Sequence, residues 1–168
     1  DSLKIVRKSV LIYETIIEFH LSEERVNEIL IFSPTGSIST IGYDGYPYTV
    51  AVHYVYLNGN IYFHGLPKGE KLDNIKREPK VCFYIYDFKK ILKDGIVSPC
   101  KADCQYESVC VRGQAFIVHD INEKQSALNA IVEKYTPQFS GFNIPKEMLN
   151  GTCVVKIVID SVTGKYHQ

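Results

Sequence analysis

Residues 44–64, DGYPYTVAVHYVYLNGNIYFH, carry two β-hairpin signals with one long alternating segment between them. Asp44-Gly45 and Asn58-Gly59 favour tight turns, because Asp, Asn and Gly tolerate the positive φ angles that two-residue hairpin loops need. A period of two predicts a strand of an antiparallel sheet that lies against a core. The two faces of the segment are Tyr48, Val50, Val52, Tyr54 and Tyr56 on one side, and Thr49, Ala51, His53 and Val55 on the other.

Further strand patterns lie on both sides of this segment. The period of two begins at Gly36, before the first turn. Later strands are expected over 81–86, from about 106 to 118, and over 152–160, with an end at 163–165. Within the longest of them, Arg112-Gly113 predicts a β-bulge or a close approach of two backbones, although Gly113 could equally be a plain packing site.

Three other segments show helical patterns. Residues 23–32 are expected to form an amphipathic helix with Ser22 as its N-cap. A short helix is expected to begin with Pro67 in its first turn, and a longer one is expected from Asn122 to Tyr135.

This order of elements predicts a mainly β fold with flanking helices, in which five or six antiparallel strands form a small closed or split barrel. The length of 168 residues favours one sizeable core over two independent domains. We therefore expect a single domain, with residues 36–168 as the barrel and residues 1–35 as an N-terminal extension and a helix that packs on it. Residues 1–21 contain an apolar run that fits neither period, so their structure stays open.

The charge balance and the length of the apolar runs argue against nucleic acids and membranes as partners of this chain. The chain has 19 basic and 19 acidic side chains. Nucleic acids and anionic membranes attract a basic excess or stripe, so neither is expected as a partner. No run reaches the roughly 18 to 20 apolar residues of a bilayer span, and the first residues lack a secretory layout. A cytoplasmic location is the expectation.

The five cysteines form an odd set with no Cys-x-x-Cys pair, which argues against a disulfide framework or a zinc finger. Cys100, Cys104 and Cys110 lie close in sequence, but their spacing matches no structural zinc pattern and no nearby histidine completes one. We expect reduced thiols and no metal site. The set is Cys82, Cys100, Cys104, Cys110 and Cys153.

Residues 61–71, IYFHGLPKGEK, run from a strand end through a Gly/Pro turn into a helix. A helix N-terminus presents unpaired N–H groups and a partial positive charge. His64, Lys68 and Lys71 could converge there, and together they suit a phosphate monoester. The alternative is a basic surface turn whose lysines stay solvated and whose histidine caps the helix.

Six segments resemble, in their order and spacing, the FMN-binding split-barrel flavoproteins related to pyridoxamine 5′-phosphate oxidase, and within them the branch that contains nitroimidazole-resistance proteins. The resemblance covers roughly residues 36–165. This branch usually has proline where Ala51 stands and small residues where Leu66-Pro67 stand. The segments are DGYPYTVAVHYVY (44–56), GNIYFHG (59–65), GEKLD (69–73), PKVCF (79–83), YESVCVRG (106–113) and TGK (163–165).

The resemblance implies an antiparallel split barrel that binds FMN at the interface of a homodimer, with both chains contributing to each site. It implies that residues 49–53 lie along the flavin ring and that His64, Lys68 and Lys71 bind the phosphate. For His53, a satisfied, half-buried histidine is an equal alternative. The full set of expected cofactor-binding residues is Thr49, Val50, Ala51, Val52, His53, Phe63, His64, Lys68, Lys71, Tyr106, Ser108 and Val109.

The resemblance also implies an FMN-dependent oxidoreductase, similar to a flavin reductase or nitroreductase, that acts on a small molecule, with NAD(P)H as a candidate partner. In such an enzyme the flavin supplies the chemistry, so no protein acid or base is named as essential. One alternative is oxidation of pyridoxamine or pyridoxine 5′-phosphate, which is weakened because no Arg-rich segment follows Thr152. The other is a non-catalytic module that binds FMN or haem.

Overall fold

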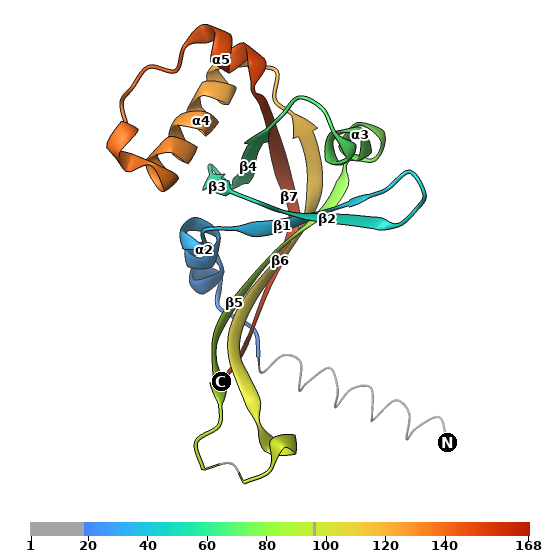
Figure 1. Ribbon diagram of the computed structural model, residues 1–168, viewed down its shortest axis with the longest axis vertical. Coiled ribbons are helices and arrows are strands. Elements are labelled where there is room, and N and C mark those ends of the chain that lie inside the picture. The colour runs from blue at the N-terminus through green and yellow to red at the C-terminus, as the bar shows by residue number, and fades with distance from the viewer. Residues whose placement is uncertain (1–18, 96) are drawn as a thin grey trace.

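The computed structural model describes residues 19–95 and 97–168. The first 18 residues, which hold most of the apolar run that fits neither period, lie outside it. In these residues seven strands form a single sheet with four α-helices around it (Figure 1). The elements are α2 (Glu23–Phe32), β1 (Gly36–Ile41), β2 (Pro47–Val52), β3 (Tyr54–Leu57), β4 (Asn60–Gly65), α3 (Glu70–Arg77), β5 (Lys80–Leu92), β6 (Asp103–Ile117), α4 (Ile121–Tyr135), α5 (Lys146–Gly151) and β7 (Cys153–His167).

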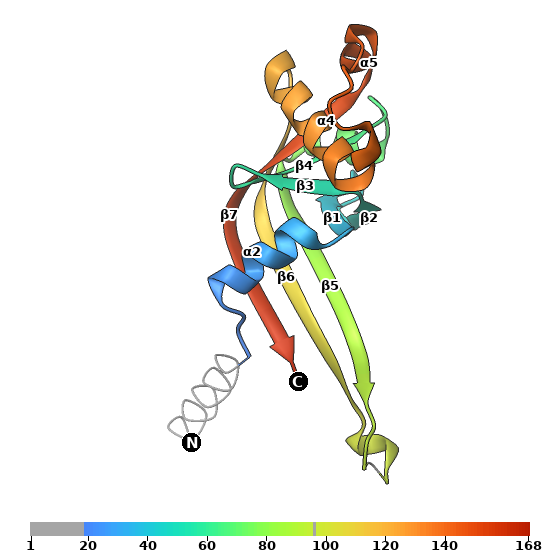
Figure 2. The same cartoon turned by 90° about the vertical axis from the view of Figure 1, so that its left-hand side faces the viewer.

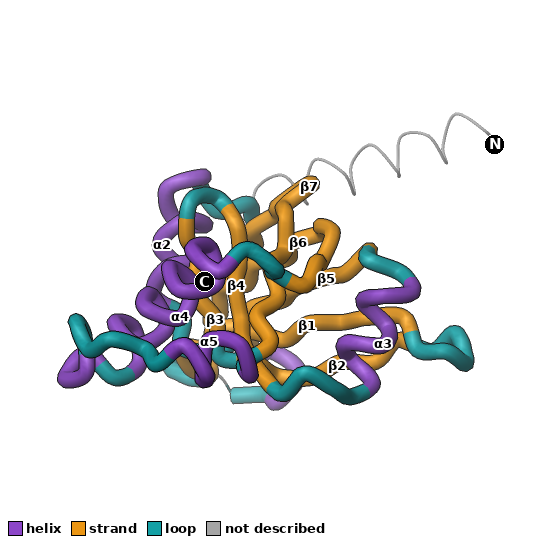
Figure 3. The backbone as a smooth tube through the Cα atoms, turned by 90° about the horizontal axis from the view of Figure 1, so that it is seen from above, coloured by secondary structure: helices purple, strands orange, loops and turns teal. Residues whose placement is uncertain are grey.

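The strand order shows that the sheet curls into a split barrel. The order is β2-β1-β5-β6-β7-β4-β3, and all paired neighbours are antiparallel. β2 and β3 therefore lie at opposite edges of the sheet, yet only His53 separates them in sequence. Because one residue advances the chain by at most about 3.8 Å, the two edges must meet at this corner. The predicted fold class is confirmed, with seven strands instead of five or six (Figure 3).

The alternating segment is thus two strands that meet at His53, not one continuous strand. Val52 and Tyr54, predicted on a common face, both lie in the barrel interior, and Thr49 and Ala51 of the other face are exposed. Val55, predicted on the same face as Thr49 and Ala51, is buried. Helix α4 covers this part of the outer face and forms a second apolar cluster with it, a long-range contact that the alternation does not encode.

The main core fills the barrel, and helix α2 covers one side of it (Figure 2). Ser22 caps α2 as predicted, and its side chain accepts a hydrogen bond from the backbone N–H of Arg25. The buried hydroxyl of Tyr54 donates to the carbonyl of Leu30 at 2.8 Å, which fixes the end of α2 to β3. The largest side chains of this core include Ile38, Ile61, Phe63, Phe83, Val111 and Ile157.

Two helix starts differ from the predictions. Helix α3 begins at Glu70, because Gly69 (φ 123°) holds a conformation that few other residues adopt, so Pro67 lies in the preceding loop. Helix α4 is capped by Asp120, whose side chain accepts from the N–H of Glu123 at 2.7 Å, and not by Asn122. Helix α5 had no predicted counterpart.

Strands β5 and β6 form a long hairpin that projects beyond the barrel (Figures 1 and 2). The predicted bulge is present, since the pairing of β6 with β7 shifts between Arg112 and Gly113. A Cβ at Gly113 would lie 2.2 Å from the carbonyl oxygen of Val158, so the close backbone approach is present too. β7 continues through Gly164 to His167, farther than predicted, because Gly164 stays paired with Val109.

The cysteines are free thiols, and among them the sulfur atoms of Cys82 and Cys110 lie 3.5 Å apart. In the part of the chain that the structure describes, no cluster of three or more His, Cys, Asp or Glu side chains could hold a metal ion. No helix in the same residues is long and apolar enough to cross a bilayer.

Candidate functional site

A hollow of about 300 Å³ lies between edge strand β2, the end of β4 and the start of α3. The pairing of β4 with β7 explains why the hollow extends to Cys153. Gly65 pairs with Cys153 on β7, and no atom lies within 4 Å of the position a Cβ would take at Gly65. The missing side chain leaves the wall open, so the thiol of Cys153 lines the hollow together with Phe63.

Lys71 brings a half-buried positive charge into this hollow. Its Nζ lies 4.9 Å from the centroid of the Phe63 ring, and burial is the main cause that lowers the pKa of its ammonium group. Within residues 19–95 and 97–168, the Lys71 ammonium has no hydrogen-bond or ion-pair partner. A cation held partly away from water without a counter-ion is costly, so the hollow favours an anion.

The start of α3 adds further polar groups to the same hollow. Lys68 and Glu70 both line it, and Gly69 forms the helix N-cap without a side-chain hydrogen bond. The first N–H groups of a helix have no partner one turn earlier, so they are available to a ligand. The Glu70 carboxylate partly offsets the two lysines. The predicted meeting of Lys68 and Lys71 at a helix start is therefore present.

The two histidines lie elsewhere. Tyr54 pairs with Phe63, and His64 follows Phe63 on β4, so the His64 side chain faces away from the hollow that Phe63 lines. His53 precedes Tyr54 at the corner between β2 and β3 and does not line the hollow. Burial, followed by the nearby His53, lowers the pKa of His64. The His53 ring stands 5.1 Å from the Tyr135 ring at 87°. The expected convergence of His64 with the two lysines is not found within one chain.

The predicted residues on β6 lie far from the hollow. Ser108 pairs with Lys165 on β7, and the path from residue 153 to residue 165 is roughly 40 Å at about 3.3 Å per residue. The side chain of Val109 is fully buried in the core, and the Tyr106 ring stacks with His167 at 6.3 Å. One chain therefore does not bring these residues to Lys71.

The other predicted residues divide between the hollow, the core and the outer face of the sheet. Val50 and Ala51 line the hollow with Phe63, Lys68 and Lys71. Val52 is buried in the core, and the Thr49 hydroxyl shares a 2.8 Å hydrogen bond with Ser39 on the outer face.

Comparison with known protein families matches residues 22–166, from the cap of α2 to the residue of β7 before His167, to a family described as pyridoxamine 5′-phosphate oxidase. The chain belongs to the pyridoxamine 5′-phosphate oxidase family. The match includes every residue of the hollow and every residue predicted to bind a cofactor.

Solved structures agree with this family assignment. A candidate 5-nitroimidazole antibiotic resistance protein from Bacteroides thetaiotaomicron is 25% identical with a TM-score of 0.76, covering 88% of this chain and 86% of that one. A flavocytochrome from Azotobacter vinelandii (18% identity, TM-score 0.76, 88% and 68% covered) shares the fold. The FAD and heme binding protein from Mycobacterium smegmatis also shares the fold, with 16% identity and a TM-score of 0.78, covering 88% of this chain and 72% of that one. Comparison with curated proteins gives no match.

Several residues that line the hollow of this family member were not predicted, and Tyr48 and Cys153 are among them. Tyr48 is on the same face of β2 as Val50, so the alternation that placed Val50 could also have pointed to Tyr48. Cys153 reaches the hollow only because β7 pairs with β4 opposite Gly65. No local signal in the sequence reports that register.

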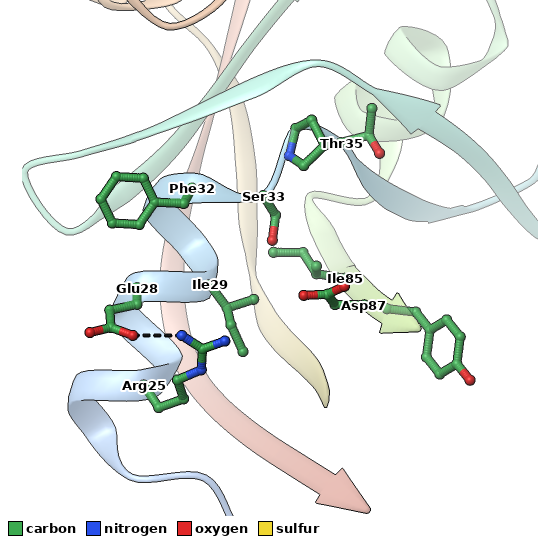
Figure 4. A pocket seen from close by; sticks show the side chains of 10 residues that line it. Arg25, Glu28, Ile29, Phe32, Ser33, Thr35, Ile85 and Asp87 are labelled. Carbon is green, nitrogen blue, oxygen red and sulfur yellow. Dashed lines mark hydrogen bonds and ion pairs between the residues drawn. The ribbon is translucent and has the colours of Figure 1, made fainter. Parts of the chain in front are cut away.

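A second hollow of this pyridoxamine 5′-phosphate oxidase family chain, about 290 Å³, lies between α2 and β5 (Figure 4). Its charges satisfy one another. Arg25 donates to Glu28 at 2.6 Å and to both carboxylate oxygens of Glu107 at 2.8 and 2.6 Å, and these bonds raise the pKa of Arg25. In contrast to Lys71, its cation already has two counter-ions. Its ion pairs connect α2 to the sheet, so this hollow is a weaker candidate for an anion-binding site.

Proposed function

We propose that this chain is a flavoprotein that binds FMN, with the phosphate in the hollow between β2 and α3. The observation that carries the proposal is the half-buried ammonium of Lys71, which has no anionic partner in the described residues. The residues present fit a phosphate monoester, since the ammonium groups of Lys68 and Lys71 and the first N–H groups of α3, at Glu70 and Lys71, have no acceptor within the described residues.

The edge of strand β2 offers a place for the rest of the cofactor. Among the described residues β2 pairs with β1 alone, so the backbone groups on its other side are available to bond a planar ligand. Val50 and Ala51 connect this edge to the phosphate hollow. The family assignment and the resemblance to FMN-binding split-barrel proteins point to the same strand.

We further propose that the protein is an oxidoreductase acting on a small molecule, with NAD(P)H as a candidate reductant. A bound flavin supplies hydride or electron transfer. The chain's own residues anchor the phosphate, present the β2 backbone to the ring and cover one side of it. The likeness to the 5-nitroimidazole resistance protein supports a nitro compound as the first acceptor to test.

The site is proposed to be completed by a second copy of the chain. Tyr106 and Ser108 lie too far along β7 to reach a cofactor held by Lys71 of the same chain, so a shared site needs them from another chain. The outer face of the sheet near them exposes apolar side chains that a second copy could cover. These include Tyr84, Tyr86 and Phe88.

The test measures flavin content and affinity. Purified protein is expected to be yellow and to release FMN on denaturation. Lys71→Ala should weaken FMN binding by about 10- to 100-fold through loss of a charge-assisted bond, and riboflavin binding by much less. Lys68→Ala should have a smaller effect in the same direction.

Lys146→Ala is the matched control, because Lys146 is an exposed lysine at the start of α5. Colourless protein that cannot be reconstituted with FMN would contradict the proposal, as would equal losses in the Lys71 and Lys146 variants. Turnover of NAD(P)H with nitro and flavin acceptors then separates an enzyme from a binding module.

A further inference from the structure

We infer that Phe63 is a positioning residue that holds the Lys71 ammonium in the hollow and thereby makes the site select phosphorylated over unphosphorylated flavin. This inference rests on the proposed function, because it deals with the same hollow. It assigns a specificity role to a ring that the anion argument did not use.

The Phe63 ring is fixed in place. It is 1% exposed, lies in the main core, and its strand β4 is paired on both sides, with Tyr54 on β3 and Val155 on β7 opposite Phe63. A ring packed in this way has little freedom to move when a ligand enters. It therefore offers Lys71 a rigid contact surface.

Lys71 is anchored from the other side by helix α3. Leu72 and Ile75 of that helix are buried in the main core, so the backbone of Lys71 cannot drift from the wall of the hollow. Its Nζ lies 4.9 Å from the centroid of the Phe63 ring, within the range of a cation–π contact. The ring face is the electron-rich partner that partly replaces the water the ammonium loses.

Without that contact, a lysine at the mouth of a hollow extends its stem and keeps its ammonium in bulk water. The ring instead holds the charge inside before any ligand arrives. A prearranged side chain loses less conformational entropy when it binds a phosphate, so affinity rises. Riboflavin has no phosphate, and the benefit applies only to the phosphorylated ligand.

The decisive quantity is the ratio of riboflavin to FMN dissociation constants, measured by quenching of flavin fluorescence. Phe63→Leu keeps an apolar side chain but removes the ring, and it should lower this ratio by about 3- to 10-fold. Phe63→Tyr keeps the ring and should preserve the ratio. In a Lys71→Met background, Phe63→Leu should leave the ratio unchanged, because no ammonium remains to be positioned.

Equal weakening of both ligands by Phe63→Leu would overturn the inference, since it would mean that the ring serves only packing. An unchanged ratio would overturn it as well. Far-ultraviolet circular dichroism and the melting temperature verify that the variant is folded.

A second measurement needs no cofactor. In the NMR spectrum of the ligand-free protein, the Hε protons of Lys71, assigned with Lys71→Arg, should be shifted upfield by the Phe63 ring and should lose this shift in Phe63→Leu. Loss of FMN binding by wild-type protein with the shift intact would refute the proposed function alone. Normal FMN binding without the shift would refute the positioning role alone.

Discussion

Arg25 shows how a single residue can join two elements of this fold. Its guanidinium donates to both carboxylate oxygens of Glu107 and so ties α2 to β6. Glu107 is only 17% exposed, and Lys89 lies 3.4 Å from it as a second cation. The hydrogen bonds from Arg25 are the largest cause that lowers the pKa of Glu107. An ion pair with two hydrogen bonds that is partly shielded from water contributes more to the stability of the fold than an exposed ion pair.

The lowered pKa of Glu107 predicts an acid-dependent stability. A carboxyl whose pKa is lower in the folded state stabilises the fold above its unfolded pKa, and this stabilisation is lost as the pH falls through the folded pKa. Glu107→Gln should therefore lower the free energy of unfolding at pH 7 by about 1 to 2 kcal/mol. The difference from wild type should shrink as the pH falls from about 5 to 3, measured by urea unfolding.

Glu28→Gln is the control for this prediction, because Glu28 binds the same arginine from an exposed position, with its side chain 55% exposed. Its effect should stay below about 0.5 kcal/mol. If the free energies of unfolding of Glu107→Gln and wild type differed by the same amount at every pH, the lowered pKa of Glu107 would not be the source of the acid dependence.

At the scale of elements, the bulge between β6 and β7 adapts the long strands to the curved sheet. The pairing shifts between Arg112 and Gly113, and the backbone of β7 passes so close to Gly113 that no side chain fits. Bulges increase local twist, which a closing barrel requires. The glycine is therefore part of the curvature that brings β7 against β4 and places Cys153 at the hollow.

Gly113→Ala should lower the free energy of unfolding by about 2 to 3 kcal/mol, because its Cβ would overlap the carbonyl of Val158, a backbone atom that cannot move without breaking the ladder. Gly151→Ala, where a Cβ would meet nothing within 4 Å, is the control and should change stability by less than about 1 kcal/mol. Chemical denaturation measures both. Equal stabilities of the two variants would show that the close approach relaxes easily.

For the whole molecule, the projecting hairpin of β5 and β6 has little internal support. β7 ends at His167, opposite Tyr106, so among the described residues the hairpin continues beyond that point as two strands. Phe88 is exposed opposite Tyr106, where this part begins, and Ile91 is exposed within it. A two-stranded ribbon is marginally stable in water by itself, and cover from a second copy would stabilise it.

The proposed dimer predicts a mass in solution of twice 19.1 kDa by light scattering. Phe88→Lys combined with Ile91→Lys should shift the protein towards the monomer and reduce FMN retention, because charges on an apolar contact face oppose its burial. Phe142→Lys, at an exposed position in the loop between α4 and α5, should leave the mass unchanged. A monomeric wild-type protein with full FMN content would contradict the dimer.

The candidate site was partly predictable. Lys68 and Lys71 follow from a strand end, a Gly-containing turn and a helix start, which are all local in sequence. The His64 side chain points away from the two lysines, and this depends on which face of β4 enters the barrel. The separation of Ser108 from the hollow depends on how far β7 runs beside β6.

The sequence by itself determined the turns at Gly45 and Gly59, the helix capped by Ser22 and the strand periodicities, because each depends on backbone preferences of a few neighbouring residues. Only the tertiary structure decided the break at His53 between the two sheet edges, the burial of Val55 under α4 and the pairing of Gly65 with Cys153. These depend on which distant segments pack together. Such packing is a property of the whole apolar surface to be buried, and no local segment encodes it.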